Sequence, residues 1–307
     1  SRKVLKLADV LISSSSVLEA VLTKVNALLL RYIMNRGDKL SQKRESILGA
    51  LFLCLLLAGA SFANARVCIE PSKEQLSSMS LVAVQRVVDG DTLRLADGRN
   101  VRLIGVNTPE FGRKNKATEP FAEKAKQRLT ALIGGTKIGG TKRVRLQAGE
   151  ETKDRYGRLL AYVFTEQGEN VETALVREGL GFAIAIPPNV TYQACLTEVQ
   201  HEARIAGRGV WGHGYYSPRK SESLKRTDTG FRLVSGRLER AILKEGKAWW
   251  LLFEGRLAVM IPTTSQSYFD HRRLKALVGE TLVVSGWLIK KKLSAKQKAK
   301  KYKPFMM

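Results

Sequence analysis

Three of the carboxylates and two of the arginines in two short stretches, VVDGDTLRLADGRNVRLIGVNTPE (87–110) and KDRYGRLLAYVF (153–164), are of types that could act together in catalysis. These side chains are Asp89, Asp91, Glu110, Arg102 and Arg158. A carboxylate can take a proton from water, and guanidinium groups can offset charge that builds on phosphoryl oxygens. The planar fork of arginine also matches two phosphate oxygens at once. Together these residue types predict hydrolysis of a phosphodiester bond.

The two aspartates flank Gly90 in a turn that leaves a predicted strand. Oxygen ligands crowded in this way suit a hard cation such as Ca²⁺ or Mg²⁺. Each feature alone has an ordinary explanation: an isolated Asp-Gly-Asp is a simple turn, Arg102 could form a structural ion pair, and Glu110 could be a surface acid. The prediction of a cation beside a phosphate site therefore depends on all of them together.

The net charge of +24 predicts an anionic partner, either nucleic acid or an acidic membrane surface. Eight lysines lie between Lys290 and Lys303. This run could hold phosphates or acidic lipid, and its ordinary interpretation is a solvated tail. No CxxC occurs and the spacing of the three histidines matches no zinc site. No obligate protein partner is evident.

Met34 begins a pattern that is typical of a secretory signal. A basic segment, an apolar run over 47–62 and the small-x-small site Ala63-Asn64-Ala65 predict a signal peptide over 34–65. Cleavage near Ala65 would export the protein to the periplasm or the medium. A membrane anchor is the alternative, but the run is short for a span of ~20 residues.

The predicted signal has two consequences. Residues 1–33 would precede it, where no residues are expected. We therefore expect Met34 to be the true start and residues 1–33 to be an over-extended reading or a fragment edge. Export leaves Cys68 and Cys195 in an oxidising compartment, where we predict that they form a disulfide between the arm and a helix. Two unrelated thiols are the alternative.

Alternating apolar residues predict strands over 80–89, 92–106, 143–147 and 159–165, with a hairpin turn at Asp97-Gly98. Helical spacing predicts three helices. The first is capped by Thr118 with Pro120 in its first turn, and the others cover 171–179 and 191–206. This pattern predicts an α+β domain with a five-stranded β-barrel and three helices.

The remaining chain suggests further segments. We predict an N-terminal arm over 66–79, the main domain over 80–213, a polar linker over 214–229, an OB-like β domain over 230–290 and a basic tail over 291–307. The last of these ends in KPFMM, which is either a truncated segment or a closing strand. Trp249 and Trp250 could stack on single strands or pack in the second core.

Over roughly 81–212 the chain resembles the staphylococcal nuclease (thermonuclease) family through VVDGDT, VRLIGVNTPE, DRYGRLLAYVF and ALVREGLGFA leading to GRGVWG. The resemblance implies an OB-type barrel and Ca²⁺-dependent hydrolysis of DNA and RNA with low sequence specificity, leaving 3′-phosphates. It implies phosphate contacts from Arg102 and Arg158, a general base at Glu110, cation ligands at Asp91, Asn107 and Thr108 with Asp89 nearby, and a nucleotide contact at Tyr156. We add Arg155 to the predicted substrate-binding residues.

Two departures from the family pattern support a different function. Asn107 stands where the best-known member has an aspartate ligand, which predicts weaker metal binding or a changed metal. Ile184 and Ile186 stand where that enzyme has tyrosines in its nucleotide pocket. Both favour a binding protein with weak or lost catalysis on a nuclease scaffold. The complete set Arg102, Glu110 and Arg158 favours the enzyme, because a pure binder has little need for Glu110.

Overall fold

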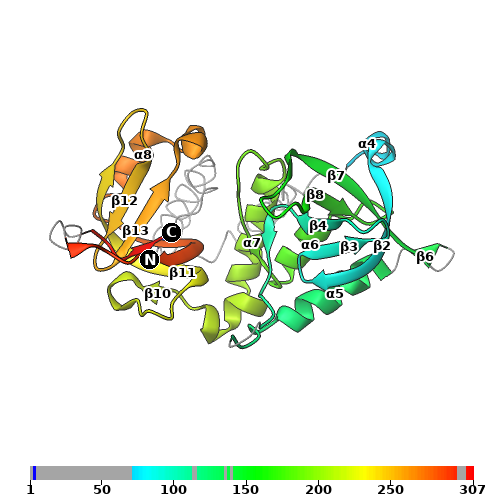
Figure 1. Cartoon of the computed structure of the whole chain (residues 1–307), viewed down its shortest axis with the longest axis horizontal. Helices are drawn as coiled ribbons and strands as arrows, with labels where there is room; N and C mark the ends of the chain where they lie inside the picture. The colour runs from blue at the N-terminus through cyan, green and yellow to red at the C-terminus, as the bar shows by residue number, and fades with distance from the viewer. Residues whose placement is uncertain (1–2, 5–70, 113–115, 135–136, 139–140, 296–301) are drawn as a thin grey trace, which may run out of the picture. The chain divides into compact units, whose positions relative to one another are not determined.

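In the computed structural model of the protein, the described residues are 3–4, 71–112, 116–134, 137–138, 141–295 and 302–307 (Figure 1). All of these described residues belong to one compact unit. The predicted signal peptide and Cys68 lie outside the described residues. Within the described ranges, no helix is both long enough and apolar enough to cross a membrane.

The N-terminal barrel is a closed sheet of five strands. In sheet order they are β2 (Ser80–Asp89), β3 (Thr92–Leu95), β4 (Asn100–Leu103), β8 (Leu159–Phe164) and β7 (Thr141–Lys153). The first half of β2 pairs with β7 and the second half with β3, with register shifts on either side of Val87. Such irregularities bend a strand, which lets β2 close the barrel. The predicted five-stranded barrel is confirmed.

Three helices cover this barrel, as predicted. They are α5 (Ala122–Gly134), α6 (Val171–Arg177) and α7 (Gln193–Ile205), and α6 packs against both of the others. The predicted start of α5 was wrong, because Thr118 does not cap it: the Thr118 hydroxyl accepts a hydrogen bond from Gly112 N at 3.1 Å instead. Phe121, just before the helix, has a φ of 70°, so the chain turns sharply there.

The C-terminal barrel is also closed by five strands. They are β11 (Gly230–Ile242), β12 (Trp249–Phe253), β13 (Leu257–Ile261), β15 (Phe305–Met306) and β14 (Thr281–Lys290), which pairs back onto β11. Helix α8 (His271–Ala276) lies between β13 and β14 in the sequence, which is the predicted OB-like order. Trp249 packs against the core, and the apolar KPFMM segment supplies β15 as a closing strand.

Several shorter elements bear on the predicted segments and the site. In the predicted arm, α4 (Lys73–Ser78) is capped by Ser72. The segment predicted as a linker contains η3 (Gly214–Tyr216), β10 (Arg219–Lys220) and η4 (Ser221–Ser223). The short β5 (Val106–Asn107) pairs with β9 (Phe182–Ala183) beside the mouth of the N-terminal barrel.

A buried acid in α6 makes the stability of the fold depend on pH. Glu172 is completely buried, and its Oε1 accepts a hydrogen bond from Val163 N at 2.9 Å. Its Oε2 has no hydrogen-bond partner among the described residues. Burial therefore raises the pKa of Glu172 to about 8, whereas an unfolded chain would keep it near 4.5. Between these two values the folded protein holds a proton that the unfolded chain lacks.

We therefore expect the free energy of unfolding to fall as pH rises from 5 towards 8, by up to the order of 1 kcal/mol per pH unit from this residue. Glu172→Gln cannot ionise and keeps an oxygen for Val163, so the variant should lose this part of the slope. Urea unfolding of both proteins at pH 5, 6.5 and 8 measures it. Parallel pH profiles for the two proteins would contradict the assignment.

Candidate active site

The turn between β2 and β3 brings Asp89 and Asp91 to the mouth of the N-terminal barrel. Asp91 N donates to Asp89 Oδ1 at 3.1 Å, which fixes the turn. A Cβ atom at Gly90 would lie 2.5 Å from Thr108 Oγ1 and 2.7 Å from the Cβ of Ala125. Only glycine fits at position 90, because the turn packs closely against both Thr108 and helix α5.

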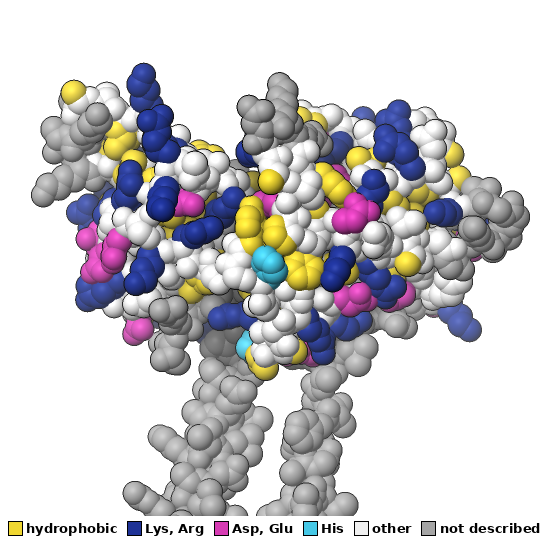
Figure 2. Space-filling view, turned by 90° about the horizontal axis from the view of Figure 1, so that it is seen from below, with side chains coloured by type: hydrophobic (Ala, Val, Ile, Leu, Met, Phe, Trp, Pro, Cys, Tyr) yellow, Lys and Arg dark blue, Asp and Glu magenta, His cyan; other side chains and the backbone are white. Residues whose placement is uncertain are grey.

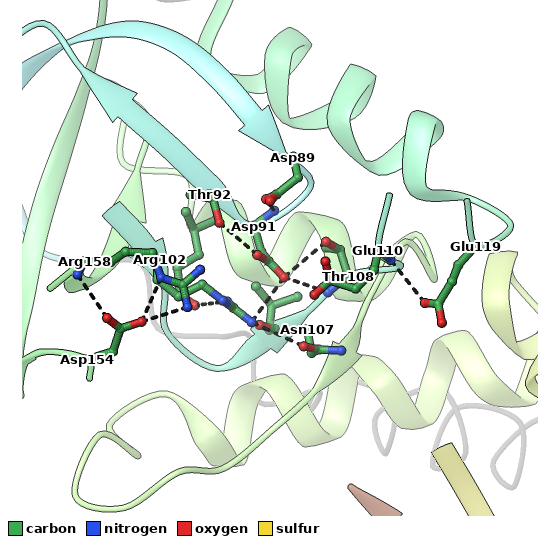
Figure 3. Close-up of polar contacts among 12 residues, drawn as sticks. Asp89, Asp91, Thr92, Arg102, Asn107, Thr108, Glu110, Glu119, Asp154 and Arg158 are labelled. Atoms are coloured by element: carbon green, nitrogen blue, oxygen red, sulfur yellow. Dashed lines mark hydrogen bonds and ion pairs between the residues drawn. The ribbon is translucent and has the colours of Figure 1, made fainter. Parts of the chain in front are cut away.

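Asp91 is the centre of the polar network at this site (Figure 3). Its Oδ2 accepts hydrogen bonds from Thr108 N at 2.9 Å and Thr108 Oγ1 at 3.1 Å. The same oxygen lies 3.1 Å from Arg102 Nη2, while Oδ1 accepts from the hydroxyl of Thr92 at 3.2 Å. These contacts hold the buried carboxylate of Asp91 in one orientation.

Arg102 reaches this network from β4. Its Nη1 donates to the backbone carbonyls of Leu103 and Val106, the latter at 2.8 Å. Its Nη2 lies 3.4 Å from Asn107 Oδ1. With 12% of its side chain exposed, the guanidinium is held in one orientation, and Asp91 and Asn107 both face it. The structure thus joins three of the predicted site residues directly.

Arg158 is held by an acid that the sequence analysis missed. Arg158 Nε and Nη2 both lie 2.7 Å from Asp154 Oδ2. The other oxygen of Asp154 accepts from the backbone nitrogens of Arg158 and Tyr156. Burial alone would raise the pKa of Asp154, but the hydrogen bonds from Arg158 and Tyr156 bring this pKa below its usual value. The Asp-x-x-Gly turn before Arg158 was the available sequence signal.

Tyr156 projects into solvent next to these arginines. Its side chain is 68% exposed. The guanidinium of Arg155 lies 4.8 Å and that of Arg158 5.6 Å from the centre of its ring, and Arg155 Nη2 donates to the Tyr156 hydroxyl at 2.7 Å. An exposed ring flanked by two cations suits contact with a base or sugar next to a phosphate.

Glu110 follows Thr108 and Pro109 and is tied to a second acid. Glu110 N donates to Glu119 Oε2 at 3.1 Å, and Glu119 N donates to the carbonyl of Glu110 at 2.9 Å. These two bonds fix the backbone of Glu110 and involve no atom of its own carboxylate. Glu119 is the second residue that the sequence analysis missed.

The acids around Asp91 repel one another. Burial first, and then the charges of Asp91 and Asp89, raise the pKa of Glu110. Burial, followed by the charge of Asp91, likewise raises the pKa of Asp89. The part of each shift that comes from neighbouring negative charge is the part that a bound cation would relieve.

The donor types here fit a hard cation: carboxylates of Asp89 and Asp91, the amide oxygen of Asn107 and the backbone carbonyl of Thr108. In the described part of the chain, however, no three His, Cys, Asp or Glu side chains are grouped so that they could hold a metal ion.

Ile184 and Ile186 line a cavity of about 410 Å³. Phe231 and Trp287 of the C-terminal barrel line it as well. Ile186 is 53% exposed, so this surface next to β9 is apolar and offers no tyrosine hydroxyl from these two positions. The sequence-based expectation that this pocket differs from the family's nucleotide pocket stays a prediction.

The proposed disulfide also stays a prediction. Cys195 lies on α7, with its Sγ 3.6 Å from Thr173 Oγ1. Cys68 is not among the described residues.

Known proteins resemble this chain over the same region. Residues 100–213 match the family described as staphylococcal nuclease homologue. The thermonuclease of Staphylococcus intermedius is 38% identical over 135 residues, which cover 42% of this chain and 74% of the relative. The thermonuclease of Staphylococcus hyicus is 36% identical over 42% of this chain and 75% of its own length. The SPbeta prophage-derived endonuclease YokF of Bacillus subtilis (strain 168) is 32% identical over 45% of this chain and 46% of its own length.

The matched region contains Arg102, Asn107, Thr108, Glu110 and Arg158. Two relatives match over about three quarters of their length at more than a third identity. The chain belongs to the staphylococcal nuclease family.

Proposed function

We propose that this protein is a nuclease that hydrolyses phosphodiester bonds of DNA and RNA with low sequence specificity, with the help of a divalent cation for which Ca²⁺ is the first choice and Mg²⁺ the second. The observation that carries the proposal is the arrangement of two anchored guanidinium groups, Arg102 and Arg158, with the carboxylate of Glu110 at one barrel mouth (Figure 3).

Each side chain has a distinct part in the proposed reaction. The raised pKa of Glu110 brings it closer to that of an effective base, so it can take the proton of the attacking water. Arg102 and Arg158 stabilise the charge on the phosphoryl oxygens, since neither has to reorganise. A cation held by Asp91, Asn107 and Thr108, near Asp89, would supply further charge stabilisation. Tyr156 and Arg155 would contact the neighbouring nucleotide.

The surface charge favours a polyanionic substrate. Lys and Arg side chains are spread over the face shown in Figure 2, where acidic side chains form smaller groups. The excess of 52 basic over 28 acidic residues would attract nucleic acid without reading its sequence. We include export after cleavage near Ala65 in the proposal, and we assign the lysine-rich tail to phosphate or acidic lipid contact.

A direct cleavage assay tests this function. Protein that begins at Arg66 is incubated with single- and double-stranded DNA and with RNA, in Ca²⁺, in Mg²⁺ and in EDTA. We expect cleavage of all three substrates that EDTA stops. Salt-sensitive binding without cleavage in any of these metals would instead support a catalytically inactive nucleic-acid-binding protein, the alternative that Asn107 favours.

Asn107→Asp should strengthen cation binding. The change adds a carboxylate beside Asp91 and opposite Arg102, at the position of the present 3.4 Å contact. Because Ca²⁺ affinity rises with the number of charged ligands, we expect the Ca²⁺ concentration for half-maximal cleavage to fall by about tenfold. Titration of the cleavage rate with Ca²⁺ measures it. An unchanged midpoint would exclude Asn107 from the cation site.

A further inference from the structure

The carboxylate of Glu119 connects the Glu110 segment to the C-terminal barrel. One oxygen of Glu119, Oε2, accepts from Glu110 N at 3.1 Å. The other, Oε1, accepts from the Tyr215 hydroxyl at 3.2 Å and from Arg232 Nη1 at 3.3 Å. Arg232 lies on β11, so a residue of the second barrel contacts the acid that fixes the backbone of Glu110.

Arg232 is held in this position by its own neighbours. Its Nη1 also donates to the carbonyl of Phe231 at 2.8 Å, and its Nη2 lies 3.4 Å from the Tyr215 hydroxyl. Its guanidinium lies 5.4 Å from the centre of the Tyr215 ring. The side chains of Arg232 and Glu119 are only 17% and 20% exposed. An ion pair this far removed from solvent is costly to break on one side, because the remaining charge is left unpaired.

Further contacts lie next to this ion pair. The Tyr216 hydroxyl donates to the carbonyl of Pro120 at 2.7 Å, next to Glu119. The ring centres of Phe182 and Phe231 lie 5.0 Å apart. Phe182 is the strand partner of Asn107 in the β5–β9 pair. The aromatic contact and the ion pair thus both connect to the segment 107–110, because Phe182 pairs with Asn107 and Glu119 accepts from Glu110 N.

From these contacts we propose that Arg232 is a positioning residue for Glu110 and acts through Glu119. The proposal deepens the nuclease function and rests on it. Arg232 touches neither substrate nor reacting atoms. Its charge keeps Glu119 in the orientation that binds Glu110 N, so the C-terminal barrel contributes to turnover at a site that lies entirely in the N-terminal barrel.

Arg232→Gln in the full chain tests the proposal. We expect kcat to fall by about tenfold with KM unchanged, since a small misplacement of a base costs rate rather than affinity. Arg232→Lys keeps a cation beside Glu119 and should recover most of kcat. Arg237→Gln is the matched control: it lies on the same strand and pairs with Glu254 at 3.1 Å, with 54% of its side chain exposed. Its kcat should equal that of the wild type.

A double-mutant cycle separates positioning from general stabilisation. Glu119→Gln should lower kcat. Adding Arg232→Gln to it should cause little further loss, because both changes break the same series of contacts from Arg232 through Glu119 to Glu110 N. Wild-type kcat in Arg232→Gln, a loss that multiplies with that of Glu119→Gln, or an equal loss in Arg237→Gln would overturn the proposal.

Amide exchange decides the proposal without reference to activity. Peptides that contain Glu110 should exchange faster in Arg232→Gln than in the wild type, because Glu119 no longer holds Glu110 N, and Arg237→Gln should show no change. Equal exchange in all three proteins would overturn the proposal. A wild type that cleaves nothing would instead refute the nuclease function, and the exchange result would still decide whether Arg232 positions this segment.

Discussion

Glu110→Gln should reduce kcat by about 10²- to 10⁴-fold while the protein continues to bind nucleic acid. Glutamine keeps the size of the side chain, and the backbone bonds to Glu119 do not involve the carboxylate that is replaced. In the proposed reaction the variant loses only the carboxylate assigned to take the proton from water. Removing one negative charge beside the phosphate should leave binding as tight as before or tighter. Steady-state cleavage and anisotropy of a labelled oligonucleotide measure the two quantities.

Glu123→Gln is the control for this change. Glu123 lies in the first turn of α5, is exposed, and accepts a hydrogen bond from Gln127 at 3.2 Å. Its loss should leave both cleavage and binding at the wild-type level. A Glu110→Gln variant that cleaves within a factor of about three of the wild type would show that another group accepts the proton.

Arg158→Ala should reduce kcat by about 10²- to 10³-fold, the cost of losing one preorganised donor at a developing charge. Arg158→Lys should recover only part of this rate, because lysine offers a point charge without the planar fork. Asp154→Asn should cause a smaller loss, since it weakens the 2.7 Å contact that orients Arg158 without removing the guanidinium. Single-turnover cleavage at saturating substrate isolates this step.

The control for Arg158→Ala is Arg99→Ala. Arg99 is an exposed arginine near the β3–β4 turn, paired with Asp97 at 2.6 Å. It has the same charge, so its removal tests whether general loss of basicity explains the effect. Equal single-turnover rates for Arg158→Ala and Arg99→Ala would contradict the assigned role of Arg158.

The barrel strands could be predicted because their determinants are local. Apolar residues alternate along 80–89 and 92–95, and Asp97 and Gly98 form the turn between β3 and β4, with Gly98 at a φ of 89°. The start of α5 could not be predicted in the same way. Thr118 has the residue type of a cap, but its hydroxyl bonds to Gly112, a partner that only the folded loop brings near.

The candidate site residues likewise include some that local sequence predicts and some that depend on the tertiary structure. Arg102, Glu110 and Arg158 lie in recognisable short motifs, so their types and spacing predict chemistry. The proposed role of Glu119 depends on Arg232, which lies 113 residues later in the chain and contacts the Glu119 carboxylate. No spacing rule encodes a contact across that separation. It exists because β11 of a second barrel packs beside the segment that follows Glu110, and that packing is a property of the tertiary structure.

The most direct test of the proposed nuclease site compares the wild type with Glu110→Gln on one labelled single-stranded oligonucleotide in Ca²⁺, measuring binding and cleavage in the same sample. We predict that the variant binds at least as tightly as the wild type, with rapid cleavage by the wild type alone that stops on addition of EDTA. Equal binding with no cleavage by either protein would contradict the hydrolytic function and leave a nucleic-acid-binding protein built on a nuclease fold.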